Sequence, residues 1–482
     1  MNKPLRRIAV AVMAMFAAML VNINYIQVLR AEDLRTERGN SRLILEEYSR
    51  ERGPIVVAGE AIASSVETDG DLKFVRQYAQ GPLYAPATGF YSRVYGATGV
   101  EQAENAILGG TDDRLFVRRI LDTLTGEAAR GGSVALTLDP AAQQAAADGL
   151  SERPGAVVAL EPTTGRILAL ASSPTYDPNV LADPDGKAVT AAFDQLDADP
   201  ARPLINRAIS EIYPPGSTFK IVTTAAALES GRFTPDSEVF GGAELDLPQS
   251  TATLPNSSGA ACTGGETTTL LEALKRSCNT SFGQIGIDLG AEVLAAQAEA
   301  FGFGTRLEIP VGTAVSRFPA DANAPQTAQS AIGQFDVAAT PLQMAMVAAG
   351  VANRGIVMAP YLVNEVRGPD TVSLDVTEPR ELSRAVSPQT AGTLTAMMVA
   401  VVEEGTGSNA AISGVRVAGK TGTAQQGGDR PPHAWFVSFA PADDPQVAVA
   451  VIIESGGGEA EISGNRLAAP VARDVMAAVL DQ

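Results

Sequence analysis

Histidine is almost absent from this chain of 482 residues, in which His433 is the single example. A metal site built from several histidines is therefore excluded, and a serine activated by a histidine and an aspartate is disfavoured. Lysine is also scarce, because only six of the 36 basic residues are lysines. We expect neither a metal ion nor an organic cofactor.

Basic residues are outnumbered by acidic residues over the whole chain. The chain has 36 basic against 55 acidic residues, a net charge of −19, and it has no basic run beyond its N-terminus. Such an acidic surface repels phosphate backbones, so nucleic acid is not an expected partner. The apolar fraction of 45% and the charged fraction of 19% are those of an ordinary globular protein.

Long apolar runs are missing with one exception, at the N-terminus. Lys3, Arg6 and Arg7 precede an apolar run from Ile8 to Val28. About 21 helical residues at 1.5 Å each span ~31 Å, roughly the hydrocarbon core of a bilayer. The basic flank should stay cytoplasmic, which places everything after Leu29 outside. A cleaved signal peptide is the alternative, but the run is long and no small-residue cleavage site closes it cleanly. We therefore predict a permanent single-pass anchor.

Only two cysteines occur, Cys262 and Cys278. In an oxidising compartment they could form one disulfide that closes a short loop, worth ~3 kcal/mol on the loop-entropy account. Two unpaired core cysteines are the alternative, because the sequence does not give the distance between them.

A candidate nucleophile follows a break in the chain. Pro214-Pro215-Gly216 stands directly before Ser217, where a helical apolar pattern begins, so Ser217 should lie at or just inside a helix N-terminus. Lys220 follows at i+3 on the same helix face. Lysine can deprotonate a serine when burial and a second cation lower its pKa. A capping serine with a solvated lysine would show the same pattern, so this motif alone does not decide.

Two further clusters follow in order along the chain. Ser277-Cys278-Asn279 ends a helical run from Leu270 and offers a hydroxyl and an amide. Lys420-Thr421-Gly422-Thr423 ends a predicted strand from Val415 and offers a cation, a hydroxyl and a glycine that permits close backbone approach. Acyl transfer needs such a base, proton shuttle, carboxylate anchor and set of oxyanion donors. A second Ser-x-Asn, Ser463-Gly464-Asn465, comes after the Lys-Thr-Gly and fails on order.

This ordered set resembles that of the class B penicillin-binding proteins. Residues 155–162, 202–207, 332–334 and 340–343 resemble further parts of the family's transpeptidase domain, and Arg52-Gly53-Pro54-Ile55 resembles the start of its pedestal domain. The short pedestal and the Ser-Cys-Asn motif are similar to the actinobacterial penicillin-binding protein A group. Residues 56–59 depart from the usual pedestal pattern.

The resemblance implies a peptidoglycan D,D-transpeptidase. Ser217, deprotonated by Lys220, would attack the D-Ala-D-Ala bond of a stem peptide, and an amine from a second stem peptide would resolve the acyl-enzyme. β-Lactam antibiotics would acylate Ser217 and stay. The family further implies a membrane glycan polymerase as partner.

The resemblance also assigns the remaining site residues. Ser277 would relay the proton to the departing D-alanine, and Asn279 would hold the substrate backbone. Lys420 and Thr421 would bind the terminal carboxylate, and Lys420 would help to keep Lys220 neutral. Beside Gly422, the backbone N–H of Thr423 would join that of Ser217 in the oxyanion hole.

The pattern of elements predicts an α+β fold. It comprises an anchor over residues 1–29, a pedestal over 30–151 that begins with a helical stalk over 30–52, and a transpeptidase domain over 152–482. In the last, strands at 156–160, 167–171, 415–418, 434–439 and 447–453 should form an antiparallel sheet flanked by helices, with a helix at 467–480 covering it, and the first two strands should form a hairpin. Within the pedestal, residues 101–108 should form a short helix and Asp139 should cap another.

Two other functions stay open. The first is a hydrolase of the same fold, a D,D-carboxypeptidase or a β-lactamase, in which water resolves the acyl-enzyme. The second is a non-catalytic β-lactam sensor or a scaffold. His433 stands beside Pro431 and Pro432 after the Lys-Thr-Gly turn and is expected to be structural, with Trp435 and Phe436 in the core.

Overall fold

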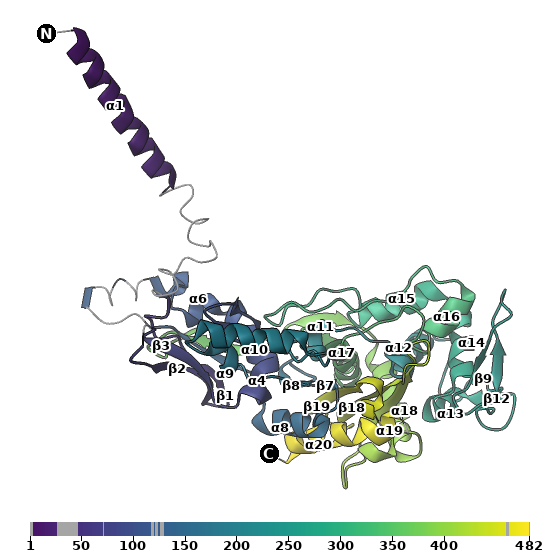
Figure 1. Cartoon of the computed structure of the whole chain (residues 1–482). Coiled ribbons are helices and arrows are strands. Elements are labelled where there is room, and N and C mark those ends of the chain that lie inside the picture. The colour runs from purple at the N-terminus through teal and green to yellow at the C-terminus, as the bar shows by residue number, and fades with distance from the viewer. Residues whose placement is uncertain are drawn as a thin grey trace.

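The computed structural model describes residues 3–26, 47–70, 72–116, 120, 124–125, 130–458 and 462–481. Its first element is α1 (Lys3–Asn24), which projects alone and buries no residue (Figure 1). With a mean hydropathy of 1.8, α1 is long and apolar enough to cross a membrane, and no other helix within the described ranges is. The predicted stalk of residues 30–52 lies mostly outside the described residues.

A six-stranded sheet organises the N-terminal part of the folded region. Four of its strands come from this part of the chain: β1 (Ile55–Val57), β2 (Glu60–Glu67), β3 (Phe74–Tyr78) and β6 (Ser133–Leu136). Two come from much further along: β14 (Val363–Arg367) and β15 (Ser373–Val376). The strand order is β15-β14-β6-β1-β2-β3, with β14 antiparallel to β6. The region predicted as the pedestal thus shares a sheet with the region predicted as the larger domain.

A buried ionic cluster fixes the helices beside this sheet. The predicted helix over 101–108 is two short helices, α5 (Gly99–Ala103) and α6 (Asn105–Leu108). The Glu101 carboxylate in α5 accepts from Arg52 Nε at 2.7 Å and from Arg76 Nε at 2.6 Å. Burial raises the pKa of Glu101, but Arg76 and Arg52 outweigh it and hold this pKa below its ordinary value. Buried charge persists only when it is paired in this way.

The second sheet takes its strands from both ends of the larger domain. The predicted hairpin is confirmed as β7 (Gly155–Leu160) and β8 (Ile167–Ser173), and β17 (Ala418–Ala424), β18 (His433–Ala440) and β19 (Val447–Ile453) complete it. The order is β17-β18-β19-β7-β8, and all pairs are antiparallel. An α+β fold with an antiparallel sheet between helices is thereby confirmed.

One strand begins later than predicted. Val415 is not in a strand, because its N–H donates to the Ile412 carbonyl oxygen at 3.1 Å in a tight turn. The ladder with β18 therefore begins at Ala418. As a consequence, the Lys-Thr-Gly motif and Thr423 lie within β17 and not at its end.

Helices cover both faces of the five-stranded sheet. Alternate residues of β7 and β19 pack into two separate apolar cores, as the two-residue period of a strand requires. One core contains α8 (Pro140–Leu150), capped by Asp139 as predicted, and α20 (Ala469–Leu480). The other contains α17 (Pro341–Ala352), in which every residue is buried. The helix predicted at 467–480 is interrupted near its start: α19 (Gly464–Leu467) ends at Leu467, and α20 begins at Ala469.

A helical extension lies on the side of the sheet away from the N-terminal region (Figure 1). Its helices are α13 (Leu270–Arg276), α14 (Asn279–Leu289), α15 (Ala291–Ala300) and α16 (Ala324–Ser330). Two ribbons accompany them, β9 (Glu238–Phe240) with β12 (Thr267–Thr269), and β10 (Glu244–Asp246) with β11 (Thr253–Pro255). The elements that connect these layers include α4 (Gly81–Thr88), α9 (Asn179–Ala182), α10 (Gly186–Ala198), α11 (Arg207–Ser210), α18 (Pro388–Glu403), β13 (Ile356–Met358) and β16 (Glu381–Arg384).

Candidate active site

Ser217 lies in a single turn of 3₁₀-helix, Gly216–Phe219, which leads directly into α12 (Lys220–Glu229). The turn is held from two sides. The N–H of Gly216 donates to the Gly333 carbonyl oxygen at 2.9 Å, and the indole Nε1 of Trp435 donates to the Pro214 carbonyl oxygen at 3.1 Å. Gly216 has φ of 53°, in the left-handed region that favours glycine. The expected position at a helix start is therefore observed.

Strand β17 packs closely against this turn. A Cβ atom on Gly422 would lie only 2.9 Å from Thr218 Cγ2 and 2.9 Å from Trp435 Cβ. Glycine is thus required by the close approach of two elements, as predicted for the Lys-Thr-Gly motif. Thr423 follows on the same strand and is exposed.

The Ser-Cys-Asn motif forms the junction between two helices. Ser277 ends α13 with φ of 61°, and Asn279 is the first residue of α14. This sharp change of direction presents the Ser277 carbonyl oxygen, its hydroxyl and the Asn279 side chain to the same buried amine, that of Lys220.

Lys220 is completely buried and makes two short contacts. Its Nζ donates to the Ser277 carbonyl oxygen at 2.7 Å and to Asn279 Oδ1 at 2.8 Å, while Ser277 Oγ lies at 3.4 Å. Burial, reinforced by the nearby Lys420, holds the pKa of Lys220 well below its ordinary value. A neutral amine has two N–H donors and one lone pair. In that form the two short contacts would use both donors, and the lone pair would be available for a proton.

Lys420 is the second buried cation of the site. Its Nζ donates to Ser277 Oγ at 2.8 Å and to the Thr421 carbonyl oxygen at 3.0 Å. Burial lowers the pKa of Lys420 to about 7. The Ser277 hydroxyl therefore bridges the two lysines that the sequence placed far apart.

The structure brings together Lys220, Ser277, Asn279 and Lys420, but it does not join Ser217 to them by a hydrogen bond. Ser217 is half-buried, and its Oγ has no hydrogen-bond partner among the described residues. Catalytic hydrogen bonds often tighten only when substrate is bound. The arrangement thus places a buried amine with a lowered pKa one helical turn from the Ser217 hydroxyl.

Thr406 is a site residue that sequence reasoning missed. Its Oγ1 lies 2.8 Å from Thr421 Oγ1, and its N–H donates to the Lys275 carbonyl oxygen at 3.2 Å. Thr406 therefore links β17 to the end of α13, directly before Ser277. No short motif marks it, because the contact joins two segments that are separate in the sequence.

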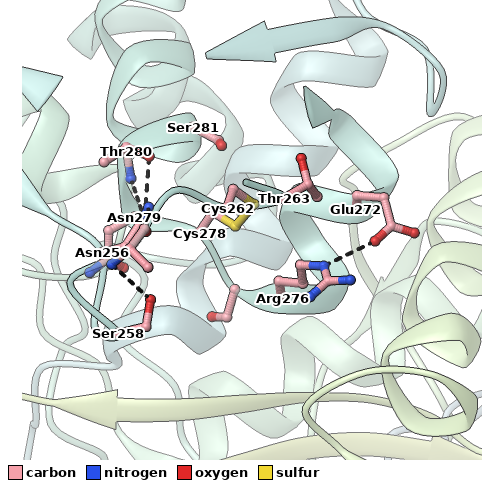
Figure 2. Close-up of a disulfide and its surroundings, with 12 residues drawn as sticks. Asn256, Ser258, Cys262, Thr263, Glu272, Arg276, Cys278, Asn279, Thr280 and Ser281 are labelled. Atoms are coloured by element: carbon pink, nitrogen blue, oxygen red, sulfur yellow. Dashed lines mark hydrogen bonds and ion pairs between the residues drawn. A yellow bond between two sulfur atoms is a disulfide. The ribbon is translucent and has the colours of Figure 1, made fainter. Parts of the chain in front are cut away.

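Cys262 and Cys278 are joined by a disulfide with Cα atoms 5.7 Å apart (Figure 2). Cys278 is the middle residue of the Ser-Cys-Asn motif, and Cys262 lies between β11 and β12. The bond therefore ties the segment that connects β11 to β12 to the motif that contacts Lys220. Asn256 lies in the same connecting segment, directly after β11, and stands beside Thr280 in Figure 2. It was not predicted as a site residue.

His433 has a structural environment. Its Nδ1 accepts from the Ser455 N–H at 3.1 Å, and its ring meets Tyr213 edge-on at 5.3 Å between centroids. Burial lowers the pKa of His433 to about 4. Trp435 and Phe436 are completely buried, as expected, although Trp435 also holds the turn before Ser217.

Known proteins resemble this chain over almost all of its length. Residues 155–477 match the penicillin-binding protein transpeptidase domain, and residues 52–134 match the penicillin-binding protein A dimerisation domain. The peptidoglycan D,D-transpeptidase PbpA of Mycolicibacterium smegmatis is 50% identical over 489 residues, which cover 100% of this chain and 99% of that protein.

Solved structures agree with the sequence relatives. The ceftriaxone acyl-enzyme complex of penicillin-binding protein A from M. tuberculosis is 47% identical, with a TM-score of 0.88 over 90% of this chain and 100% of that one. The penicillin G acyl-enzyme complex of the same protein has a TM-score of 0.85 at 47% identity and covers 89% of this chain and 100% of that one.

Proposed function

Since this chain belongs to the class B penicillin-binding proteins and is a peptidoglycan D,D-transpeptidase, we propose that Ser217 is its nucleophile and Lys220 the base that activates it. The observation that carries this assignment is the environment of Lys220. Its amine is buried beside a second cation, and its two N–H donors are occupied by Ser277 O and Asn279 Oδ1. A lowered pKa favours the neutral form of this amine, whose lone pair can accept the serine proton.

Acylation then proceeds in two proton-balanced steps. The Ser217 hydroxyl gives its proton to Lys220 Nζ while Oγ bonds to the carbonyl carbon of the penultimate D-alanine. The tetrahedral intermediate collapses when the C–N bond breaks and the leaving D-alanine nitrogen takes a proton. Ser277 Oγ, between Lys220 and Lys420, supports the path for this proton because it lies within reach of both amines. The products are a Ser217 ester and free D-alanine.

Lys420 and Thr421 hold the terminal carboxylate in this proposal. A pKa of about 7 leaves Lys420 partly neutral in the free enzyme, and an arriving carboxylate favours the charged form. Thr406 Oγ1 can donate to Thr421 Oγ1, which leaves the Thr421 hydroxyl hydrogen for the carboxylate. The N–H groups of Ser217 and Thr423 serve as oxyanion donors, where one such donor is typically worth 10²- to 10³-fold in rate.

An amine of a second stem peptide completes the reaction. It attacks the ester carbonyl, gives a proton back through Lys220 and releases Ser217 with a new peptide cross-link. In a β-lactam the C–N bond that breaks is part of a ring. The leaving nitrogen therefore stays covalently linked to the acyl group and remains in the site. The β-lactam acyl-enzyme is therefore long-lived.

We further propose that α1 anchors the chain once in the membrane with the catalytic region outside. The basic residues Lys3, Arg6 and Arg7 at the start of the apolar helix support this orientation. A membrane glycan polymerase is the proposed partner, since cross-linking follows the making of glycan strands at the same surface.

The test is the partition of the acyl-enzyme between amine and water. Full-length protein in detergent is given a D-Ala-D-Ala stem peptide and an amine acceptor peptide, and products are separated by mass. The proposal predicts a cross-linked dimer, absent with Ser217→Ala. Hydrolysed peptide as the main product would establish the D,D-carboxypeptidase alternative, and no turnover with stable penicillin labelling would establish the sensor.

A further inference from the structure

Three consecutive residues of the Ser-Cys-Asn region are tied to one short piece of chain. We name this piece, residues 255–262, the tether segment; it begins at the last residue of β11. Cys278 is bonded to Cys262, and Asn279 Nδ2 donates to the Pro255 carbonyl oxygen at 3.1 Å. Thr280 is held by Asn256, whose Oδ1 accepts from the Thr280 N–H at 3.1 Å (Figure 2).

Asn256 uses all of its hydrogen-bonding capacity within the protein. Its Nδ2 donates to the carbonyl oxygens of Gly242 at 3.1 Å and Ala260 at 3.0 Å. Its Oδ1 accepts from the Thr280 N–H and lies 3.3 Å from Thr280 Oγ1. Asn256 is buried, with 6% of its surface exposed. It therefore fixes the tether segment and the start of α14 in one rigid unit.

Helix α14 lacks a cap of its own. An N-cap side chain normally accepts a hydrogen bond from the N–H of the second or third helical residue. Cys278 occupies the N-cap position and makes no side-chain cap, because its sulfur is committed to the disulfide. Thr280 is the second helical residue, and its N–H is the one that Asn256 accepts. Asn256 thus supplies the missing cap from a separate segment.

We propose that Asn256 is a positioning residue for Asn279. Asn279 is the first residue of α14, between the residue bonded to Cys262 and the residue capped by Asn256. Its Oδ1 must stay at 2.8 Å from Lys220 Nζ for one donor of that amine to be occupied. Loss of the Asn256 cap frees the first turn of α14 to move, and the Lys220 amine then loses one of the two acceptors that fix its position. This inference rests on the function proposed for Ser217 and Lys220.

The test is a double-mutant cycle on the full-length protein in detergent. The measured quantity is the second-order rate constant of acylation by a fluorescent penicillin. Asn256→Ala should slow acylation about tenfold, the effect of one lost cap expressed as a rate. In the Asn279→Ala background it should cause no further slowing, because it acts through Asn279. The same slowing in both backgrounds, or a wild-type rate for Asn256→Ala, would overturn the proposal.

A matched control separates positioning from stability. Asn179 also bridges to another element through the backbone of Tyr78, with contacts of 2.9 Å and 3.0 Å. Asn179→Ala should lower the melting temperature while acylation stays at the wild-type rate. If Asn179→Ala slows acylation as much as Asn256→Ala does, the slowing follows from lost stability and Asn256 has no special role.

A second variant keeps the test valid if Asn256→Ala fails to fold. Asn256→Asp retains an acceptor oxygen for the Thr280 N–H and should acylate within about threefold of wild type; a tenfold or greater loss in folded protein contradicts the proposal. Absence of acylation in the wild-type protein would refute the proposed function instead, so the two failures are distinguishable.

Discussion

Replacing Gly422 by alanine should push the strand that carries Lys420 away from the turn that carries Ser217. The added Cβ would lie 2.9 Å from both Thr218 Cγ2 and Trp435 Cβ, where ordinary contacts begin at 3.4 Å. Both neighbours are packed in the interior, so β17 must shift by about 0.5 Å. Overpacking of this kind costs about 1–3 kcal/mol of stability.

The shift should also slow the reaction, by an increase in the activation barrier comparable to its cost in stability. A displacement of 1 Å in a catalytic group can reduce a rate about 10²-fold, so about 0.5 Å should reduce acylation roughly tenfold. The assay is the rate of labelling by a fluorescent penicillin, with the urea midpoint measured on the same samples.

Gly392 provides the matched control. It lies within α18, is exposed, and a Cβ there would have no atom within 4 Å. Gly392→Ala should raise stability by about 1 kcal/mol and leave acylation unchanged. A Gly422→Ala protein that acylates at the wild-type rate would refute the inference that close packing of β17 against the turn that carries Ser217 sets the rate.

Three further predictions follow from the same geometry. Lys220→Ala should slow acylation by about 10²- to 10⁴-fold in a protein with a native circular dichroism spectrum, and a normal rate would show that another group is the base. The free energy of unfolding should rise between about pH 7 and about pH 10, because the unfolded chain there holds protons that the folded chain has lost from Lys420 and from Lys220, whose pKa is also lowered. Lys420→Met should reduce that rise in urea midpoints measured across the range; an unchanged slope would mean that Lys420 does not contribute to it. Cys262→Ser should lower stability by about 3 kcal/mol, and titration of denatured, unreduced wild type should find no free thiol; two thiols would contradict the disulfide.

Local patterns in the sequence predicted much of the fold. The β7–β8 hairpin, α13 and the Asp139 cap of α8 each depend on a few neighbouring residues, and each has the expected form. Val415 was misplaced because an apolar residue in a tight turn looks like the first residue of a strand. The pairing of β14 with β6 could not be predicted, because it joins strands separated by more than two hundred positions.

Some residues of the candidate site could likewise be placed from local sequence patterns, and others could not. Ser217 and Lys220 could be placed together because they lie one helical turn apart. The meeting of Lys220, Ser277 and Lys420 required the order of motifs and the family resemblance, since no periodicity relates them. Thr406 and Asn256 act through contacts with single atoms of distant segments, and such contacts leave no pattern in one sequence.

The identity of the acylated residue decides whether Ser217 is the nucleophile. Full-length protein is treated with penicillin, digested and sequenced by mass spectrometry. The account predicts one adduct, on Ser217, present in the wild type and absent in Ser217→Ala. An adduct on another residue, or an adduct of equal yield in Ser217→Ala, would contradict it.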